Sequence, residues 1–268
     1  MRRVERAYGR ATAPLRQLPE FLIIGGIRGG TTSMIEYLGD HPSVGIPCVE
    51  EVHFFDRHFD RGINWYRAWF PFKASSKSTS GESSPTYLME RVVPERVASL
   101  LPDVRLIVLL RDPVERAASH FSLRRGKGAE PEATLAAALK NEERRLQRRN
   151  RHPRDGGSID CYFEQGSYVK GLRRWLEHFA REQMLIINSD DFFADPAAVY
   201  DRTISFLDLS HHRPDFLVHN SAPRLIVEDE TLVKLRELYR LPRDVGPDNH
   251  RLASRRRPTI RLRCSVSS

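Results

Sequence analysis

Hydrophobic positions along the chain form short continuous runs that alternate with segments of helical period. The runs Phe21–Ile24, Arg105–Leu110 and Met184–Ile187 predict buried strands, and Val44–Ile46 predicts a shorter one. Strands that alternate with helices are typical of a doubly wound parallel sheet, so we predict an α/β fold. The segments with helical period are a stretch that ends before His41-Pro42, followed by Ile63–Phe70, Arg91–Leu101, 132–149, Tyr168–Ala180, Pro196–Leu207 and Glu228–Tyr239.

The polar segments set the predicted domain boundaries. Residues 1–18 are interpreted as a basic N-terminal arm, 19–253 as a single domain, and 254–268 as a loose basic tail. Within the domain, Lys73–Ser80 is predicted to be a Ser/Thr/Lys loop that leads into Gly-Glu-Ser-Ser-Pro. The sequence shows no internal repeat, and the chain is long enough for one substantial core.

Composition narrows the possible environments of the chain. The formal net charge is +8, from 43 Lys and Arg against 35 Asp and Glu, which fits either attraction to polyanions or ordinary solvated faces. Three scattered cysteines suit a reducing compartment rather than a disulfide framework or a zinc cluster. The sequence has neither a membrane-spanning apolar run nor the apolar core of a secretory signal, so we expect a soluble, cytoplasmic protein.

The segment Phe21–Leu38 carries the most specific signal. An apolar strand is followed by a Gly-rich turn with one Arg, and then by two hydroxyl residues that open a helix. Backbone N–H groups and the positive end of the helix dipole point to the same place in such a unit. The segment therefore predicts a site for a phosphorylated ligand.

This loop differs from that of nucleotide triphosphatases. Gly25 and Gly30 have the Walker spacing, but Thr31 occupies the position of the Lys that contacts the β- and γ-phosphates. The nearby cation, Arg28, lies inside the loop instead of after it. The pattern favours a donor whose terminal group needs one cation and no metal ion.

Three ordered motifs together resemble the sulfotransferases that use 3′-phosphoadenosine 5′-phosphosulfate (PAPS). The similarity covers about residues 21–239 and is greatest to the heparan sulfate glucosaminyl sulfotransferase branch and its bacterial relatives. The matching stretches are Arg28-Gly-Gly-Thr-Thr32, Glu51-Val-His-Phe-Phe-Asp56 and Arg105-Leu-Ile-Val-Leu-Leu-Arg-Asp-Pro-Val-Glu-Arg-Ala-Ala-Ser-His120.

The resemblance implies a P-loop-like fold with three layers, in which helices flank a central parallel sheet. It also implies transfer of a sulfuryl group from PAPS to a hydroxyl of a glycan, glycolipid or natural product, without a metal and without a specific nucleic-acid partner. The oligomeric state stays open. The residues implied to hold the donor are Arg28, Gly29, Gly30, Thr31, Thr32, Arg111 and Ser119, with Asn220, Ser221 and Arg224 assigned to a C-terminal loop over it.

Two residues compete for the role of catalytic base. The resemblance assigns it to Glu51, whose apolar neighbours Val52 and Phe54 would partly desolvate the carboxylate. His53 is the alternative, because other sulfotransferase branches use a His. In an extended segment, alternation would put Glu51 and His53 on one side, with Asp56 placed to orient His53 or the acceptor.

Two departures from the family pattern keep other functions open. Arg28 and Ser83 stand where many relatives have Lys. These departures favour one alternative, a catalytically impaired member that binds polyanions. A P-loop nucleotide kinase is the other alternative. Trp65, Tyr66 and Trp69 either stack an acceptor or belong to the core.

Overall fold

The computed structural model describes residues 11–151, 161–217 and 227–240. Five strands form one sheet in the order β2-β3-β1-β4-β5, and every adjacent pair is parallel. Their bounds are β1 Phe21–Gly25, β2 Val44–Gly45, β3 Thr79–Ser83, β4 Arg105–Leu110 and β5 Met184–Asn188. The predicted parallel α/β fold is confirmed.

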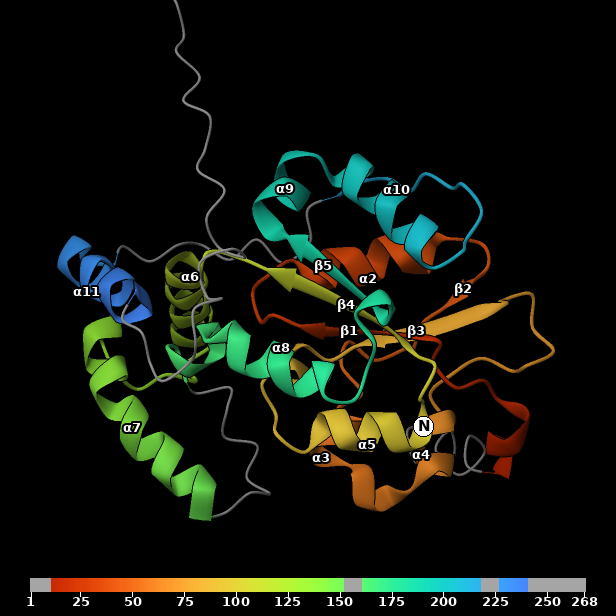
Figure 1. Cartoon of the computed structure of the whole chain (residues 1–268), viewed down its shortest axis with the longest axis horizontal. Coiled ribbons are helices and arrows are strands. Elements are labelled where there is room, and N and C mark those ends of the chain that lie inside the picture. The colour runs from red at the N-terminus through yellow and green to blue at the C-terminus, as the bar shows by residue number, and fades with distance from the viewer. Residues whose placement is uncertain (1–10, 152–160, 218–226, 241–268) are drawn as a thin grey trace, which may run out of the picture.

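Helices cover both faces of this sheet (Figure 1). The first group is α2 Thr31–Asp40, α9 Ser189–Ala194 and α10 Pro196–Phe206; the second is α3 Phe54–Arg57, α4 Ile63–Arg67, α5 Val93–Leu100 and α8 Tyr168–Leu176. A third group lies beyond one end of the sheet and consists of α6 Pro113–Gly126, α7 Leu135–Arg151 and α11 Asp229–Arg240. The three-layer arrangement matches the expectation from the resemblance.

Alternation along the strands divides the core in two. Phe21 and Ile23 pack with α2 and α10, whereas Leu22 and Ile24 pack with α4, α5 and α8. Successive side chains of a strand point to opposite faces, so a strand buried on both faces reads as a continuous apolar run. This is why β1 and β4 were visible in the sequence.

Strand β3 is a correction to the sequence prediction: the predicted loop Lys73–Ser80 ends before Thr79, and Thr79–Ser83 form a strand. Thr-Ser-Gly-Glu-Ser has no apolar run, yet the strand is inserted between β2 and β1. Its polar groups are satisfied by groups outside the strand: Ser80 Oγ donates to the Leu18 carbonyl at 2.9 Å, and three hydroxyl groups donate to Glu82. Gly81 is required because the Phe21 ring occupies the place of a β-carbon. Hydrogen bonding, and not hydrophobicity, specifies this strand.

The other differences concern element ends and short helices. The helices α3 and α9 were not predicted, and they have four and six residues. The helix predicted for Ile63–Phe70 ends as an α-helix at Arg67. The described part of the N-terminal arm contacts the domain, since Arg16 donates to the Phe70 carbonyl at 2.7 Å.

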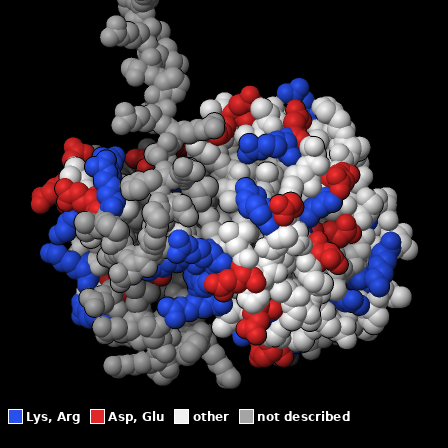
Figure 2. Space-filling model, viewed as in Figure 1, with Lys and Arg blue, Asp and Glu red and all other residues white. Residues whose placement is uncertain are grey.

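Charges of both signs are interspersed over the face of the molecule in Figure 2. Solvated helix faces therefore account for the charge on this view. Among the described residues, no helix combines the length and the apolar character needed to cross a bilayer.

Candidate functional site

The carboxyl ends of the parallel strands bring the predicted motifs to one edge of the sheet. Arg28 follows β1, Ser84 follows β3, Arg111 follows β4 and Ser189 follows β5. From β1 the chain passes through α2 to β2 on one side of β1, whereas β4 lies on the other side. The strand order therefore reverses at β1, and ligands of open α/β sheets usually bind at the carboxyl ends of the strands at such a point. The candidate site is built here from two groups of residues.

The first group is the loop between β1 and α2. The Gly29 N–H donates to the Gly26 carbonyl at 2.9 Å, and Ser189 Oγ donates to the Gly29 carbonyl at 2.8 Å, so the start of α9 also holds the loop. A β-carbon on Gly29 would lie 2.4 Å from the Leu109 carbonyl oxygen, which explains the glycine. The loop is thus fixed against the backbone of β4.

Helix α2 presents its N-terminus to this loop. The N-cap residue Gly30 has φ 99° and no side chain, so no side-chain oxygen caps the first turn that Thr31 and Thr32 begin. Uncapped N–H groups and the helix dipole favour an anion at this position. The structure therefore brings together the loop residues predicted to hold the donor.

Arg28 lies inside the loop with a left-handed backbone, φ 66°. Its Nε donates to Ser119 Oγ of α6 at 3.1 Å. Burial and then the adjacent charge of Arg111 lower the pKa of Arg28, although a guanidinium stays protonated at ordinary pH. Two guanidinium groups brought together in a partly desolvated place favour an anionic ligand with more than one charge.

Arg111 occupies the turn between β4 and α6. Its side chain is mostly buried, lies 5.8 Å from the Phe193 ring centre and is 3.7 Å from a Glu115 oxygen. Tyr168 donates its hydroxyl to the Arg111 carbonyl at 3.1 Å, which fixes the turn. Asp112 caps α6, accepting from the N–H groups of Val114 and Glu115 at 3.0 and 2.9 Å. Ser119, which the resemblance assigns to the donor site together with Arg111, contacts Arg28.

The second group is a chain of three ionisable side chains, Glu51, His53 and Asp56. His53 Nε2 lies 2.7 Å from Glu51 Oε2, and His53 Nδ1 lies 3.0 Å from Asp56 Oδ2. Thr86 Oγ1 also donates to the same Asp56 oxygen at 2.7 Å. The segment is not extended at His53, so the alternation considered for an extended segment does not apply. His53 has φ 53° and is the N-cap residue of α3, and this turn makes the contacts possible.

The two carboxylates determine the charge of His53. Burial alone would lower the pKa of His53, but the hydrogen bonds with Asp56 and Glu51 outweigh it and raise the pKa to about 9. The imidazole then donates from both nitrogens at neutral pH and cannot accept a proton. At Asp56, burial alone would raise the pKa of the carboxyl group. The hydrogen bonds with His53 and Thr86 outweigh burial and lower this pKa. Of the two candidate bases, the geometry favours Glu51.

A buried carboxylate beneath this chain was missed as a functional residue. Glu82 accepts hydrogen bonds from Tyr66 at 2.8 Å, Tyr87 at 2.9 Å and Ser84 at 2.7 Å. Ser84 in turn accepts the His53 N–H at 3.2 Å, so Glu82 supports the backbone turn at His53. Burial raises the pKa of Glu82 against the effect of these bonds. The signal was the Gly-Glu-Ser-Ser-Pro motif itself, in which a carboxylate stands beside two hydroxyl residues.

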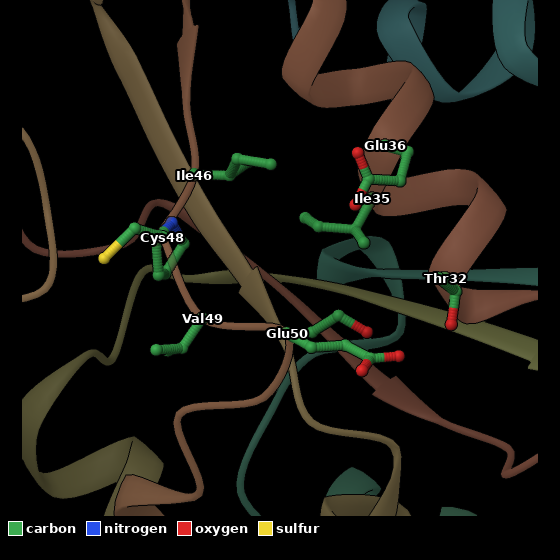
Figure 3. Close-up of a pocket in the computed structure, with 9 residues that line it drawn as sticks. Thr32, Ile35, Glu36, Ile46, Cys48, Val49 and Glu50 are labelled. Atoms are coloured by element: carbon green, nitrogen blue, oxygen red, sulfur yellow. The ribbon is translucent and has the colours of Figure 1, made fainter. Parts of the chain in front are cut away.

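Two cavities flank the segment that carries Glu51. One, of about 390 Å³, lies between α2 and the segment after β2 (Figure 3). The other, of about 230 Å³, contacts Glu51 itself and the rings of Trp65 and Trp69. Tyr66 is buried and stacks on Phe54 at 4.4 Å. Trp65 is also buried in the core and Trp69 packs against it, so all three rings belong to the core, and the two Trp residues also line the smaller cavity.

Three predicted features lie beyond these observations. Asn220, Ser221 and Arg224 fall outside the described residues, as does the tail 254–268. Within the described residues, no group of three His, Cys, Asp or Glu side chains is arranged to hold a metal ion. Independence from metal stays a prediction.

Comparison with known proteins identifies the same family. The model of the sulfotransferase domain family matches residues 18–241. Heparan sulfate glucosamine 3-O-sulfotransferase 3B1 of Homo sapiens is 35% identical over 197 residues, which cover 72% of this chain and 47% of that protein. The corresponding isoform 5 of Mus musculus is 29% identical over 220 residues, covering 78% of this chain and 59% of that protein. The chain thus spans about half the length of these curated relatives.

A solved structure agrees with these matches. The sulfotransferase from Alicyclobacillus acidocaldarius superimposes with a TM-score of 0.68 at 27% identity, covering 83% of this chain and 90% of that chain. The fold, the family model and the sequence relatives lead to one conclusion. This chain belongs to the sulfotransferase domain family.

Proposed function

We propose that the protein transfers the sulfuryl group of PAPS to a hydroxyl group of an acceptor, and that it acts in the cytoplasm. The observation that carries the proposal is the Glu51–His53–Asp56 chain, which occurs in one site with the Arg28 loop. The family match supports the donor, and the names of the relatives support a hydroxyl acceptor.

The donor is proposed to lie along the loop and the two arginines. The uncapped N-terminus of α2 and Arg28 would bind the 5′-phosphosulfate, and Arg111 with Ser119 would bind the 3′-phosphate. Contact of Ser119 with Arg28 would couple the two phosphate positions. The proposal gives each cation at this edge of the sheet an anionic partner.

The reaction is proposed as an in-line displacement at sulfur. The acceptor oxygen forms a bond to sulfur while the bond from sulfur to the 5′-phosphate oxygen breaks, and that oxygen keeps the electron pair. Glu51 takes the hydroxyl proton, and Arg28 stabilises the charge that grows on the phosphate. His53 donates to one Glu51 oxygen, so it positions the carboxylate and leaves the other oxygen for the acceptor.

The test combines donor binding with transfer. Titration calorimetry with adenosine 3′,5′-bisphosphate should show saturable binding without Mg²⁺, and labelled PAPS should deliver sulfate to a hydroxyl acceptor. ATP with Mg²⁺ is the control ligand for a nucleotide kinase. Binding of Mg-ATP without binding of the bisphosphate would overturn the proposal in favour of a kinase, and bisphosphate binding without transfer to any acceptor would favour an impaired relative.

A further inference from the structure

The larger cavity is lined by acidic and apolar residues. Its walls are α2 on one side and the segment that follows β2 on the other, and Figure 3 shows Glu36, Ile35 and Thr32 facing Ile46 and Glu50. Among the residues that the structure describes, the lining contains apolar side chains, three small polar ones and two carboxylates, but no Lys, Arg or His. The lining residues are Thr32, Ile35, Glu36, Ile46, Pro47, Cys48, Val49, Glu50 and Ser83.

The cavity adjoins the place where the proposed reaction occurs. Thr32 belongs to the first turn of α2, and Glu50 directly precedes Glu51. Ser83 directly precedes Ser84, which accepts the His53 N–H. An acceptor whose hydroxyl lies between the loop and Glu51 would therefore extend into this cavity.

The basic residues that the structure describes in the site lie elsewhere. Arg28 and Arg111 belong to the loops after β1 and β4, where the donor phosphates are proposed to bind. His58 and Arg61 line the smaller cavity on the Trp65 side, where Arg61 lies 5.3 Å from the Trp65 ring. Among the described residues, positive charge therefore lies at the donor loops and, through Arg61, at the smaller cavity, while the wall beside Thr32 and Glu50 offers carboxylates and apolar surface.

We propose that this cavity selects an acceptor that is uncharged or cationic around its reacting hydroxyl and carries an apolar portion, and that it disfavours a polyanion. The inference rests on the proposed function. Glu36 and Glu50 are exposed carboxylates at the cavity wall, and together they are expected to lower the relative affinity for an anionic group by roughly tenfold at low salt. Ile35, Ile46, Pro47 and Val49 provide the surface for the apolar portion.

Cys48 allows the charge of the cavity to be measured without knowing the acceptor. It lines the cavity as an exposed free thiol, whereas Cys161 is buried. Cys264 lies outside the described residues and is replaced by Ser for this experiment. Rates of modification by a cationic and an anionic methanethiosulfonate are compared at the same thiol, so that the reactivity of the thiol cancels in their ratio.

The cation-to-anion rate ratio at Cys48 should exceed that of free cysteine by about tenfold or more at low salt. The double variant Glu36→Gln/Glu50→Gln should bring the ratio close to that of free cysteine. Asp40→Asn is the matched control, because Asp40 is an exposed carboxylate of α2 outside the cavity lining, and it should leave the ratio unchanged. A wild-type ratio at or below that of free cysteine would overturn the proposal.

Acceptor choice is tested with three compounds that share an octyl chain: a glucoside, a glucuronide and a glucosaminide. With PAPS, kcat/KM for the neutral and cationic compounds should be at least about tenfold above that for the glucuronide, and the double variant should narrow this gap. Preference for the glucuronide or for heparan sulfate contradicts the inference, as does donor binding without transfer to either the glucoside or the glucosaminide. Failure to bind adenosine 3′,5′-bisphosphate contradicts the proposed function instead.

Discussion

His53 lies 2.7 Å from Glu51 through Nε2 and presents its other nitrogen to Asp56. An imidazole between two carboxylates is held as a cation, which excludes it as a base near neutral pH and orders the Glu51 side chain. The left-handed backbone of His53 and the Glu82 network beneath it maintain this arrangement. The roles proposed for Glu51 and His53 can therefore be tested separately.

Glu51→Gln tests the base. The amide keeps the shape of the side chain but cannot accept the acceptor proton, so kcat should fall by roughly 10²-fold or more. The affinity for adenosine 3′,5′-bisphosphate, measured by calorimetry, should change less than about threefold, since Glu51 is not in the donor loop. Asp60→Asn is the control, because Asp60 is an exposed carboxylate of the same segment. Turnover equal to the wild type would remove Glu51 as the base.

The charge of His53 predicts a pH dependence of stability. The pKa of His53 is about 9 in the folded protein, against an ordinary value of 6.5. A raised pKa means that the stabilisation is fully present below pH 6.5 and is lost as pH rises through 9. The difference in the free energy of unfolding between the wild type and His53→Gln should therefore be largest near pH 6 and shrink towards pH 9.5. Its upper value is roughly 3 kcal/mol, from 1.36 kcal/mol per pKa unit.

Two measurements check this prediction. Denaturant unfolding at a series of pH values gives the stability difference, and NMR of the labelled imidazole gives the pKa directly. The pKa of Asp56 is lowered, so the stabilisation that Asp56 contributes is lost as the pH falls. The series should therefore stay above about pH 5, where this loss does not overlap the titration of His53. A titration midpoint of His53 near pH 6.5 would show that Glu51 and Asp56 do not stabilise its protonated form.

The sequence identified the parts of the fold and of the site that depend on local pattern. Buried strands such as Arg105–Leu110 are visible as apolar runs, and the Asp112 cap is visible as Asp followed by Pro. β3 was not visible because hydroxyl groups on distant elements satisfy Glu82, and no periodicity records that pairing. The hydrogen bond between Arg28 and Ser119 also joins residues that are far apart in the sequence, so no local pattern predicts it.

Arg28 tests the leaving-group role and the departure from Lys. Arg28→Ala should weaken binding of adenosine 3′,5′-bisphosphate and lower kcat/KM together, by about 10²-fold or more, because the loop loses its cation. Arg28→Lys should keep kcat/KM within about tenfold of the wild type, since an ammonium replaces the charge but not the hydrogen bond to Ser119. Calorimetry and labelled transfer are measured on both variants. Equal behaviour of Arg28→Ala and the wild type would contradict the role.

Gly29→Ala tests whether the loop must approach β4 closely. The added β-carbon would lie 2.4 Å from the Leu109 carbonyl oxygen and 2.9 Å from that of Gly26, so backbone must shift. Overpacking of this kind costs about 1–3 kcal/mol in the free energy of unfolding. Because the backbone shift also displaces Arg28, the affinity of folded Gly29→Ala for the bisphosphate should fall by at least tenfold. Gly126→Ala is the matched control, since nothing lies within 4 Å of its β-carbon, and it should be neutral or stabilising by up to about 1 kcal/mol. Denaturant unfolding and calorimetry on both variants decide the matter: equal stability and affinity for Gly29→Ala and Gly126→Ala would show that close contact with β4 does not shape the loop.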